Sequence, residues 1–282
     1  MKTVLVTGSG SGFGFITTLE FLKKGYSVIA TMRTLQSRDE LIERAENEQL
    51  ASQLDIMEMD VTDEHQIQYV KDYIQINYKK LDVLVNNAGF CQAGFIADLT
   101  IDAFQKQLDV NLHGVFRVTK VMLPLLEQSN KANIINIGSV SGYAGFPGMS
   151  AYCASKFALA GLSESLRIEL LPKQIFVSLV EAASYQTEIW DKSLSSIDQL
   201  EMEKDPMKST VLSYAQQASK FSADPSEVAS LIASICSRKK PKLHYPIGKG
   251  ARMLAFAKRL LPWTWLEKII VKKLKHKKGN LC

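Results

Sequence analysis

Short runs of apolar residues alternate with amphipathic segments along most of the chain. The apolar runs span residues 3–8, 27–32, 55–60, 81–89, 133–139, 175–182 and 243–248. Between them, apolar positions recur with the period of a helix in residues 14–24, 64–78, 101–127 and 152–171. Strands that alternate with helices are typical of a parallel sheet covered by helices on both faces. The pattern therefore predicts an α/β fold built on a doubly wound, seven-stranded parallel sheet.

One connection interrupts this alternation. Residues 184–223 separate the sixth apolar run from a helix that we expect to begin at "DPSE", residues 224–227. In this capping box Asp224 would be the N-cap, Pro225 the first helical residue, and Glu227 would reach back toward the N-cap. An insertion of this length is usually a lid or a binding excursion. We therefore assign residues 1–250 to one domain, with 184–223 as its substrate lid, and residues 251–282 to a C-terminal extension.

The composition fits a single globular domain. Of the 282 residues, 46% are hydrophobic and 22% are charged, which suits a chain with a large core. No membrane span is expected, because no apolar run reaches about 18 residues. No signal peptide is expected either, because "MKTVLVTGSG" enters a strand and a glycine loop after an apolar run too short for a signal-peptide core. Four scattered cysteines without a CxxC pair suggest neither a disulfide framework nor a metal site; they are Cys91, Cys153, Cys236 and Cys282. We therefore expect a cytoplasmic protein without a bound metal.

Positive charge is concentrated in the C-terminal extension. Residues 252–282 contain nine lysines and arginines and one acidic residue, Glu267. The rest of the chain is slightly acidic, so the net charge of +5 belongs to the extension. An acidic domain argues against nucleic-acid binding.

The extension consists of two amphipathic pieces divided by Pro262. On a helix, the second piece would have an apolar face of Trp263, Leu266, Ile270 and Leu274 and an opposite basic face of Lys268, Lys272 and Lys275. This pattern is typical of peripheral contact with anionic lipid, here through residues 252–278. It suits equally a helix that packs on its own domain or on an oligomer partner.

A glycine-rich loop follows the first predicted strand. In "TGSGSGFG", residues 7–14, Gly8, Gly12 and Gly14 would allow a tight turn and close approach of the backbone to a pyrophosphate at the start of a helix. The alternative is a tight turn without a ligand, which needs fewer glycines. The loop therefore predicts dinucleotide binding.

The end of the second strand bears on which dinucleotide is bound. NAD-binding proteins of this architecture usually have an acidic residue there. This chain has Thr31, Met32 and Arg33. The Arg33 guanidinium, helped by the Ser11 hydroxyl, would suit a ribose 2′-phosphate, although Arg33 can also be a solvated surface charge. We therefore predict NADP (NADPH) in preference to NAD.

The stretch "SAYCASK" places Tyr152 and Lys156 four residues apart, on one face of a predicted helix. A free tyrosine has a pKa of about 10, which is high for acid–base chemistry at neutral pH. A neighbouring ammonium group favours the phenolate and would lower that pKa. The pair is thus a candidate acid/base site, although such pairs are also ordinary on helix surfaces.

Five motifs occur together in one order. They are the glycine loop at 7–14, "NNAG" at 86–89, "DVNLHG" around Asn111, "NIGSVSG" around Ser139, and "YCASK" at 152–156. In order and spacing they resemble the short-chain dehydrogenase/reductase family over residues 1–250, nearest to the branch of hydroxysteroid 17-dehydrogenases, retinol dehydrogenases and related bacterial reductases. The resemblance implies a Rossmann fold and an NAD(P)-dependent oxidoreductase.

The resemblance also implies a catalytic tetrad of Asn111, Ser139, Tyr152 and Lys156. Tyr152 would be the general acid/base that protonates the developing alkoxide when a ketone is reduced, and Ser139 would donate a hydrogen bond to the substrate oxygen. Lys156 would lower the pKa of the tyrosine and bind the nicotinamide ribose. Asn111 would hold a water that links Lys156 to solvent.

The cofactor contacts of the family can be carried over to matching positions. Asp60 would bind the adenine amino group with the backbone of Val61 beside it, and the segment after the fourth strand would lie along the adenosine ribose. Asn86 in that segment would either touch the cofactor or only support the sheet. The implied cofactor-binding residues are Gly8, Ser11, Gly12, Phe13, Gly14, Arg33, Asp60, Val61, Asn87, Ala88, Gly89, Tyr152, Lys156 and Thr187.

This chain departs from the family pattern at the end of the sixth strand. Where the family usually has Pro-Gly, it has Ala182 and Ala183, and Thr187 stands where the family has a threonine that contacts the nicotinamide. The turn must then form without a fixed φ or a permissive glycine. We expect that the strand still ends here, that Thr187 still faces the cofactor, and that the loop beyond is mobile or displaced.

Large apolar residues flank the motif positions. They are Phe90, Phe95, Tyr143, Phe146, Met149, Tyr185 and Trp190. Beside a nicotinamide site they would suit a bulky hydrophobic substrate, although each also fits a place in the core. We therefore predict an oxidoreductase that acts on an apolar ketone or secondary alcohol. The alternatives are a reductase of 3-oxoacyl thioesters and a dinucleotide-sensing scaffold.

The family resemblance further implies a homo-oligomer that forms through helices at 101–127 and 152–171.

Overall fold

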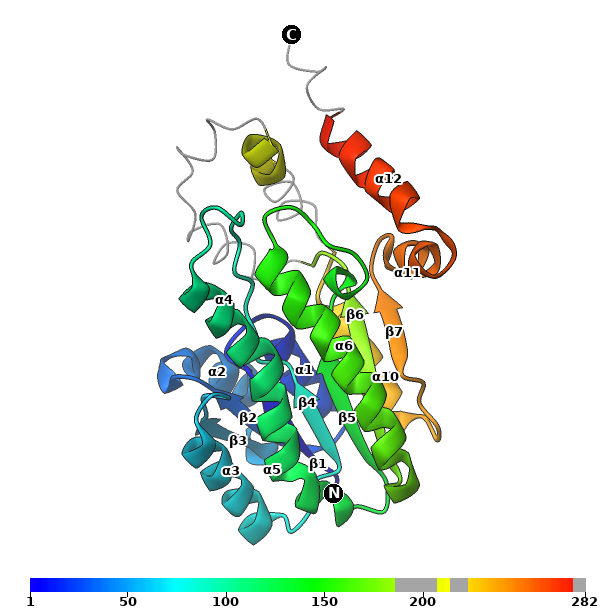
Figure 1. Ribbon diagram of the computed structural model, residues 1–282. Coiled ribbons are helices and arrows are strands. Elements are labelled where there is room, and N and C mark those ends of the chain that lie inside the picture. The colour runs from blue at the N-terminus through cyan, green and yellow to red at the C-terminus, as the bar shows by residue number, and fades with distance from the viewer. Residues whose placement is uncertain (186–206, 214–222, 276–282) are drawn as a thin grey trace.

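The computed structural model describes residues 1–185, 207–213 and 223–275. Its strands form one seven-stranded parallel sheet in the order β3-β2-β1-β4-β5-β6-β7 (Figure 1). The strands are β1 (Thr3–Thr7), β2 (Ser27–Met32), β3 (Leu54–Glu58), β4 (Val83–Asn86), β5 (Ala132–Ile137), β6 (Ile175–Ala182) and β7 (His244–Ile247). The predicted doubly wound sheet is thus confirmed.

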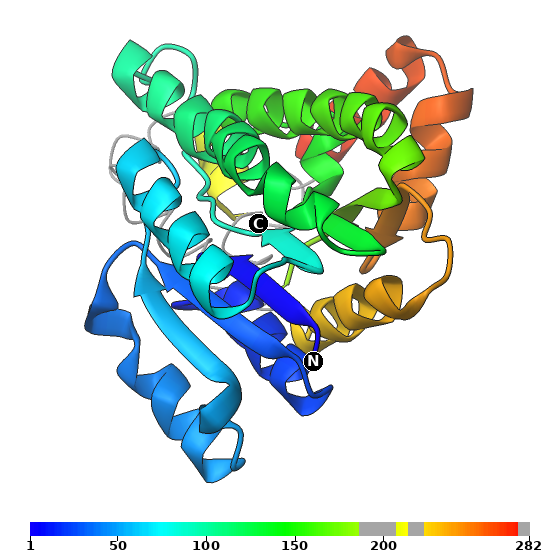
Figure 2. The same cartoon turned by 90° about the horizontal axis from the view of Figure 1, so that it is seen from below.

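Helices cover both faces of this sheet (Figure 2). They are α1 (Gly12–Lys23), α2 (Asp39–Asn47), α3 (Glu64–Asn77), α4 (Ile101–Leu108), α5 (Val115–Glu127), α6 (Ser150–Leu170), α10 (Ser226–Ser237), α11 (Ala251–Leu260) and α12 (Trp263–Lys275), with a short helix over residues 207–213. In Figure 2, α1, α2 and α10 lie on one face of the sheet, and α3, α5 and α6 lie on the other.

Alternate residues of each strand supply two separate cores. In β1, Val4 and Val6 pack in the core that contains residues of α1 and α10, whereas Leu5 packs in the core that contains residues of α3 and α5. Because both faces are buried, the central strands β1, β4, β5 and β6 are buried at every position, and most of those positions are apolar. This is why their runs stand out in the sequence.

The order of the strands reverses at β1. Val4 pairs with Val28 of β2 on one side and with Val83 of β4 on the other. Sheets of this kind form a crevice beyond the carboxyl ends of the strands at such a reversal. The glycine loop after β1 and the "NNAG" segment after β4 therefore meet at this crevice.

The helix expected over residues 101–127 is divided into three parts. α4 ends at Leu108, a π-helical turn spans Asp109–Gly114, and α5 begins at Val115. π-helical turns are rare and often lie at functional sites. This turn contains Asn111.

The expected capping box of α10 does not form as predicted. The helix begins at Ser226 with Pro225 as its N-cap, while Oδ1 of Asp224 accepts a hydrogen bond of 2.8 Å from the N–H of Ser226. Oε2 of Glu227 accepts a hydrogen bond from the hydroxyl of Tyr185 at 3.3 Å instead of reaching back to the cap. The glutamate thereby links α10 to the chain that follows β6.

The C-terminal helices α11 and α12 lie at the end of the molecule opposite the N-terminus (Figure 1). Leu266 of α12 is buried, whereas Trp263 and Trp265 are exposed. The second helix therefore packs on the domain with only part of its apolar face. Within the three described stretches, no helix is long and apolar enough to cross a lipid bilayer.

Candidate active site

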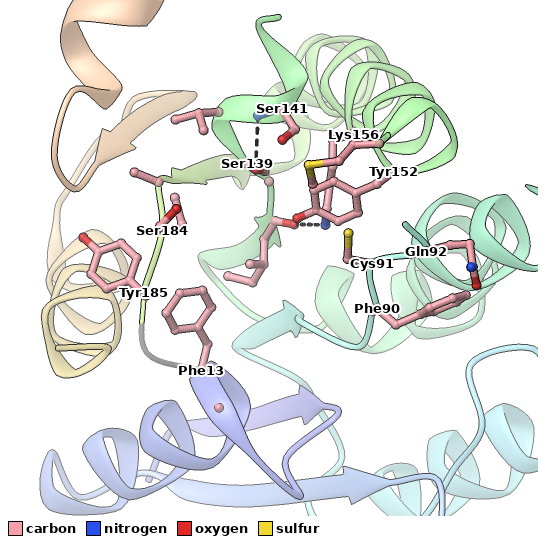
Figure 3. A pocket seen from close by; sticks show the side chains of 18 of the residues that line it. Phe13, Phe90, Cys91, Gln92, Ser139, Ser141, Tyr152, Lys156, Ser184 and Tyr185 are labelled. Carbon is pink, nitrogen blue, oxygen red and sulfur yellow. Dashed lines mark hydrogen bonds between the residues drawn. The ribbon is translucent and has the colours of Figure 1, made fainter. Parts of the chain in front are cut away.

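A large cavity lies at the carboxyl ends of the strands (Figure 3). Its volume of ≈ 1850 Å³ exceeds the roughly 300–1,000 Å³ of most small-molecule sites. The loops that follow all seven strands line it, together with α11 and α12. The cavity thus has room for a dinucleotide and for a second molecule beside it.

Close backbone contacts require two glycines of the loop after β1. Gly8 has a φ of +68°, and a Cβ there would lie 2.8 Å from Cα of Ala88. A Cβ on Gly14 would lie 2.2 Å from the carbonyl oxygen of Gly8. Neither position can therefore accept a larger residue without a shift of the backbone.

The first helix begins at this loop and directs its N-terminus toward the cavity. Its first turn contains no acidic residue, and the Ser11 side chain makes no capping hydrogen bond. Gly8, Ser11, Gly12 and Phe13 line the cavity, whereas Gly14 is not among the lining residues. This arrangement suits a phosphate group at the positive end of the helix dipole.

The segment after β4 is hydrogen-bonded to the end of β1. Nδ2 of Asn87 donates to the carbonyl oxygens of Thr7 at 2.8 Å and Gly8 at 2.9 Å. Oγ1 of Thr7 accepts from the backbone N–H groups of Asn87 and Ala88. Asn87, Ala88 and Gly89 all line the cavity, so this segment holds the glycine loop and faces the same space.

Asn86 has a different place. Its Nδ2 donates to Oγ1 of Thr119 at 3.0 Å and to Oδ1 of Asn136 at 2.9 Å, and the side chain is buried. Of its two predicted roles, the structure therefore favours support of the sheet.

Arg33, Asp60 and Val61 line the cavity at the ends of β2 and β3. The Arg33 side chain is exposed. Oδ1 of Asp60 accepts hydrogen bonds from the N–H of Thr62 at 2.9 Å and from its hydroxyl at 2.7 Å, which fixes the orientation of the carboxylate. The predicted adenosine-binding residues are thus brought to the same space as the glycine loop.

Ser139, Tyr152 and Lys156 come together at one wall of the cavity (Figure 3). Ser139 follows β5, and the other two lie on α6. Oγ of Ser139 accepts a hydrogen bond from the N–H of Ser141 at 3.1 Å, and the side chain lies close enough to Tyr152 to lower its pKa. Nζ of Lys156 donates to the carbonyl oxygen of Ile137 at 2.7 Å and lies 5.6 Å from the centroid of the Tyr152 ring. The structure therefore brings together these three predicted catalytic residues.

Burial governs the ionisation of Tyr152 and Lys156. Desolvation, with a smaller contribution from Cys91, raises the pKa of Tyr152 above its usual range, while the nearby Ser139 side chain acts in the opposite direction. Desolvation lowers the pKa of Lys156 to about 8. The pKa of Tyr152 is thus raised, whereas the sequence predicted that it would be lowered. Burial disfavours the phenolate more than the neighbouring groups favour it, and Nζ of Lys156 is hydrogen-bonded to Ile137. At neutral pH Tyr152 carries its proton.

Asn111 fixes the backbone that follows β4. Its Nδ2 donates to the carbonyl oxygen of Phe90 at 2.9 Å, and its Oδ1 accepts from the N–H of Phe90 at 3.1 Å. Nδ2 also donates to Oγ of Ser155 at 3.3 Å, and Ser155 in turn donates to the carbonyl oxygen of Tyr152 at 2.7 Å. Asn111 is not among the residues that line the cavity. It is therefore connected to Tyr152 through Ser155, and its expected role in holding a water stays a prediction.

The sixth strand ends at Ala182, as expected. The N–H of Ala183 donates to the carbonyl oxygen of Ile247 at 2.9 Å, so the chain stays beside β7 for one more residue. The two ends of the excursion then meet, because Tyr185 and Ala223 form a parallel bridge. Thr187 and the loop beyond it lie outside the described residues, and the expectations for them stay predictions.

Side-chain contacts of Tyr185 hold the turn that lacks Pro-Gly. The Tyr185 ring meets Phe13 of the glycine loop edge to face, with centroids 5.5 Å apart, and its hydroxyl donates to Glu227 of α10. Figure 3 shows Phe13 and Tyr185 side by side at the cavity. The turn is therefore positioned by distant parts of the chain and not by its own residues.

Most of the expected apolar wall is present. Phe90, Phe95, Phe146, Met149 and Tyr185 line the cavity. Tyr143 was expected there but is not among the lining residues. Burial and the nearby carboxylate of Glu181 raise its pKa above the usual range. Trp190 lies outside the described residues.

Other lining residues were missed by sequence reasoning. Cys91 lies beside Tyr152 (Figure 3), and no motif marks it. The C-terminal helices contribute Leu254, Ala257, Leu261, Leu266, Ile269 and Ile270. The spacing of three and four residues between Leu254, Ala257 and Leu261 is the signal that indicates a buried helical face.

Comparisons with known proteins agree with this description. Residues 2–197 match the family model described as "short chain dehydrogenase". The chain is 40% identical to the "Uncharacterized oxidoreductase YusZ" of Bacillus subtilis over 277 residues, and this alignment covers 97% of this chain and 98% of that protein. It is 37% identical to retinol dehydrogenase 8 of Homo sapiens over 203 residues, and this alignment covers 71% of this chain and 64% of that protein.

Solved structures show the same fold. A short-chain dehydrogenase from Streptomyces avermitilis aligns with a TM-score of 0.77 at 26% identity, over 99% of this chain and 98% of that one. Chains of this fold have been solved with NAD and with NADP bound, so the fold is compatible with either dinucleotide.

Proposed function

Since this chain belongs to the short-chain dehydrogenase/reductase family and is an NAD(P)-dependent oxidoreductase, we propose that it interconverts a ketone and a secondary alcohol on an apolar substrate. The observation that carries this proposal is the convergence of Ser139, Tyr152 and Lys156 on the cavity that the glycine loop also lines. A pure binding protein would not need these three groups at one place.

Tyr152 holds the proton that the reaction transfers. Because burial raises its pKa, the hydroxyl is protonated at neutral pH and can donate its proton to the oxygen of a ketone. Ser139 would donate a hydrogen bond to the same oxygen and stabilise the negative charge that develops there. Reduction of a ketone begins from this protonated tyrosine, whereas oxidation of the alcohol begins from the phenolate.

Lys156 supplies positive charge beside Tyr152. With a pKa of about 8, it is an ammonium group at neutral pH. When Tyr152 gives up its proton, this charge stabilises the phenolate. Burial keeps Tyr152 protonated before the reaction, and Lys156 stabilises the phenolate that forms once the proton has been transferred.

The residues at the cavity fit a dinucleotide, because the glycine loop has no space for a Cβ and the start of α1 has no acidic residue. Gly8, Gly12 and Phe13 would hold the pyrophosphate, Asp60 and Val61 the adenine, and Asn87, Ala88 and Gly89 the adenosine ribose. When bound, the dinucleotide supplies or accepts the hydride.

We infer a preference for NADP from the end of β2. Arg33 is exposed and lines the cavity, and no acidic residue occurs between it and Ser37. Its planar guanidinium suits a phosphate group. Glu40 is the first acidic residue after β2 to reach the cavity, and it lies on α2.

The apolar walls support a hydrophobic substrate. Phe90, Phe95 and Phe146 line the space together with apolar residues of α11 and α12. Burial of matching apolar surface would stabilise a steroid-, retinoid- or terpenoid-like ketone there.

Absorbance of the reduced nicotinamide tests the reaction directly. The purified chain is mixed with NADPH or NADH and a panel of steroid, retinoid, terpenoid and small polar ketones, with a 3-oxoacyl thioester as a further arm. We expect oxidation of NADPH with at least one apolar ketone, faster than with any polar one. NADPH binding without turnover on any ketone would identify a sensor instead, and fastest turnover of the thioester would identify an acyl reductase.

A further inference from the structure

An apolar surface is exposed on the two C-terminal helices. On α11, Met253, Phe256 and Leu260 follow one another at spacings of three and four residues and are 72%, 66% and 63% exposed. On α12, Trp263 and Trp265 are 51% and 62% exposed. We call these five residues the C-terminal surface. Exposed apolar groups of this size and density mark contact with a partner molecule or a membrane.

Basic side chains border the C-terminal surface. Arg252, Lys258, Arg259, Lys268 and Lys272 are all exposed on the same two helices. Among the described residues, none of the five is paired with a carboxylate, and Glu267 is the only acidic residue in the sequence of α11 and α12. Tryptophan and other apolar side chains within a basic border complement the anionic headgroups and apolar interior of a bilayer.

Specific contacts hold α11 on the domain and α12 on α11. Nζ of Lys258 lies 5.8 Å from the ring centroid of Phe157 on α6 and 5.2 Å from that of Trp263 on α12. Leu266 of α12 is buried. The C-terminal surface therefore has a defined position relative to the cavity.

Neighbouring residues of the same helices form part of the cavity wall. The cavity is lined from α11 and the residue that follows it by Leu254, Ala257 and Leu261, and from α12 by Leu266, Ile269 and Ile270. Met253 belongs to both sets, because it lines the cavity and is also among the most exposed apolar residues of α11. The apolar wall of the cavity is thus continuous with the C-terminal surface at Met253.

We propose that the C-terminal surface docks the protein on an anionic lipid bilayer and places the Met253 side of the cavity against it, so that an apolar substrate enters from the membrane. The entry of substrate rests on the proposed function, whereas bilayer binding stands on the C-terminal surface alone. A second copy of this chain is a poorer partner, because a symmetric contact would place one basic border against another.

Co-sedimentation of the full chain with vesicles tests the docking. The probes are vesicles of phosphatidylcholine alone and of phosphatidylcholine with phosphatidylglycerol. We expect binding to the anionic vesicles that weakens with added salt, and binding at least about tenfold weaker to the neutral ones. Replacing Lys268 and Lys272 by glutamine should weaken binding by about fivefold for each lysine.

A triple variant tests whether the C-terminal surface is the part that binds. Phe256→Ser, Leu260→Ser and Trp265→Ser together should abolish vesicle binding, and none of these residues lines the cavity. The matched control is Ile76→Ser with Ile168→Ser, which removes side chains that are 75% and 77% exposed on α3 and α6. The control should bind vesicles like the wild type.

Three outcomes would overturn the docking. In the first, the wild-type chain stays in the supernatant. In the second, the triple variant binds vesicles like the control. In the third, the wild type does not bind vesicles but forms a dimer that the triple variant loses and the control keeps. NADPH binding and reduction of a water-soluble ketone without vesicles should be unchanged in the triple variant, whereas reduction of a vesicle-borne apolar ketone should fall. A chain that binds vesicles but reduces no ketone would keep the docking and contradict the proposed function.

Discussion

Lys156 donates a hydrogen bond of 2.7 Å to the carbonyl oxygen of Ile137, the last residue of β5. The backbone of the sheet thereby holds the ammonium group near the ring of Tyr152. Because this place is buried, the pKa of Lys156 falls to about 8. The sheet therefore fixes the charge that we propose to stabilise the Tyr152 phenolate, and the burial of that charge has a cost in desolvation.

This cost predicts the pH dependence of stability. Lys156 loses its proton near pH 8 when folded and near pH 10.5 when unfolded. Between these values the unfolded chain binds one more proton, so stability rises with pH. We expect the unfolding free energy of the wild type, relative to Lys156→Met, to increase by at most about 3 kcal/mol from pH 7 to pH 10.5. Urea titrations of both chains measure this difference, and a flat or falling difference would contradict the assignment.

The choice of cofactor depends on Arg33. Arg33→Ala should weaken NADPH binding by roughly 10- to 100-fold, because a charge-assisted hydrogen bond contributes about 1.5–3 kcal/mol. NADH binding should change by less than about twofold, since NADH lacks the 2′-phosphate. The control is Arg38→Ala, because Arg38 is exposed and does not line the cavity. Its Nε lies 3.6 Å from Oδ1 of Asp39. Fluorescence titration gives both affinities, and equal losses for the two cofactors would argue against a role in selecting NADP.

The glycine loop should not tolerate a side chain at position 14. Gly14→Ala places a Cβ 2.2 Å from the carbonyl oxygen of Gly8, so we expect a loss of about 2 kcal/mol or more in unfolding free energy and weaker NADPH binding. Gly161→Ala on α6 is the control, because a Cβ there meets nothing within 4 Å. It should stabilise the protein by about 0.5–1 kcal/mol. Similar stability of the two variants would show that the loop can relax.

Tyr185 should be essential to the turn after β6. Tyr185→Ala removes a buried ring and its contact with Phe13, and we expect a loss of about 3 kcal/mol. Tyr185→Phe loses only the hydrogen bond to Glu227 and should cost at most about 1 kcal/mol. Tyr69→Ala, at a residue that is 68% exposed, is the control and should change stability by less than about 0.5 kcal/mol. If Tyr185→Ala costs no more than this control, the turn is held by other contacts.

The strands and the glycine loop could be predicted from sequence because their signals are local. Val4, Leu5 and Val6 are all buried, so β1 appears as a continuous apolar run. Several glycines directly after such a run are typical of a turn that brings the backbone close to a phosphate group. The pairing of Tyr152 with Lys156 was predictable for the same reason, since the two residues lie one turn apart on a helix.

Other features depend on contacts between distant residues, which leave little local signal. The turn after β6 is positioned by Phe13 and Glu227, each far from Tyr185 in the sequence. Helix periodicity predicted a regular helix around Asn111, whereas the chain forms a π-helical turn in which Asn111 is hydrogen-bonded to Phe90 and Ser155.

The ionisation of Tyr152 and the place of the C-terminal helices also depend on three-dimensional surroundings. The sequence shows a neighbouring lysine for Tyr152 but not how deeply the phenol is buried, and burial decides the sign of the pKa shift. The periodicity of α12 shows an apolar face but not how much of it the domain covers. Leu266 is buried, whereas Trp265 is left exposed.

The proposed function depends most on Tyr152 as the proton donor, and turnover of Tyr152→Phe tests this role most directly. We predict that kcat for reduction of an apolar ketone falls by roughly 10²- to 10⁴-fold while NADPH affinity changes by less than about threefold. The matched control is Tyr143→Phe, which removes a nearby hydroxyl from a residue that does not line the cavity and should keep most of its turnover. A Tyr152→Phe enzyme with turnover within about threefold of the wild type would contradict the assignment of Tyr152.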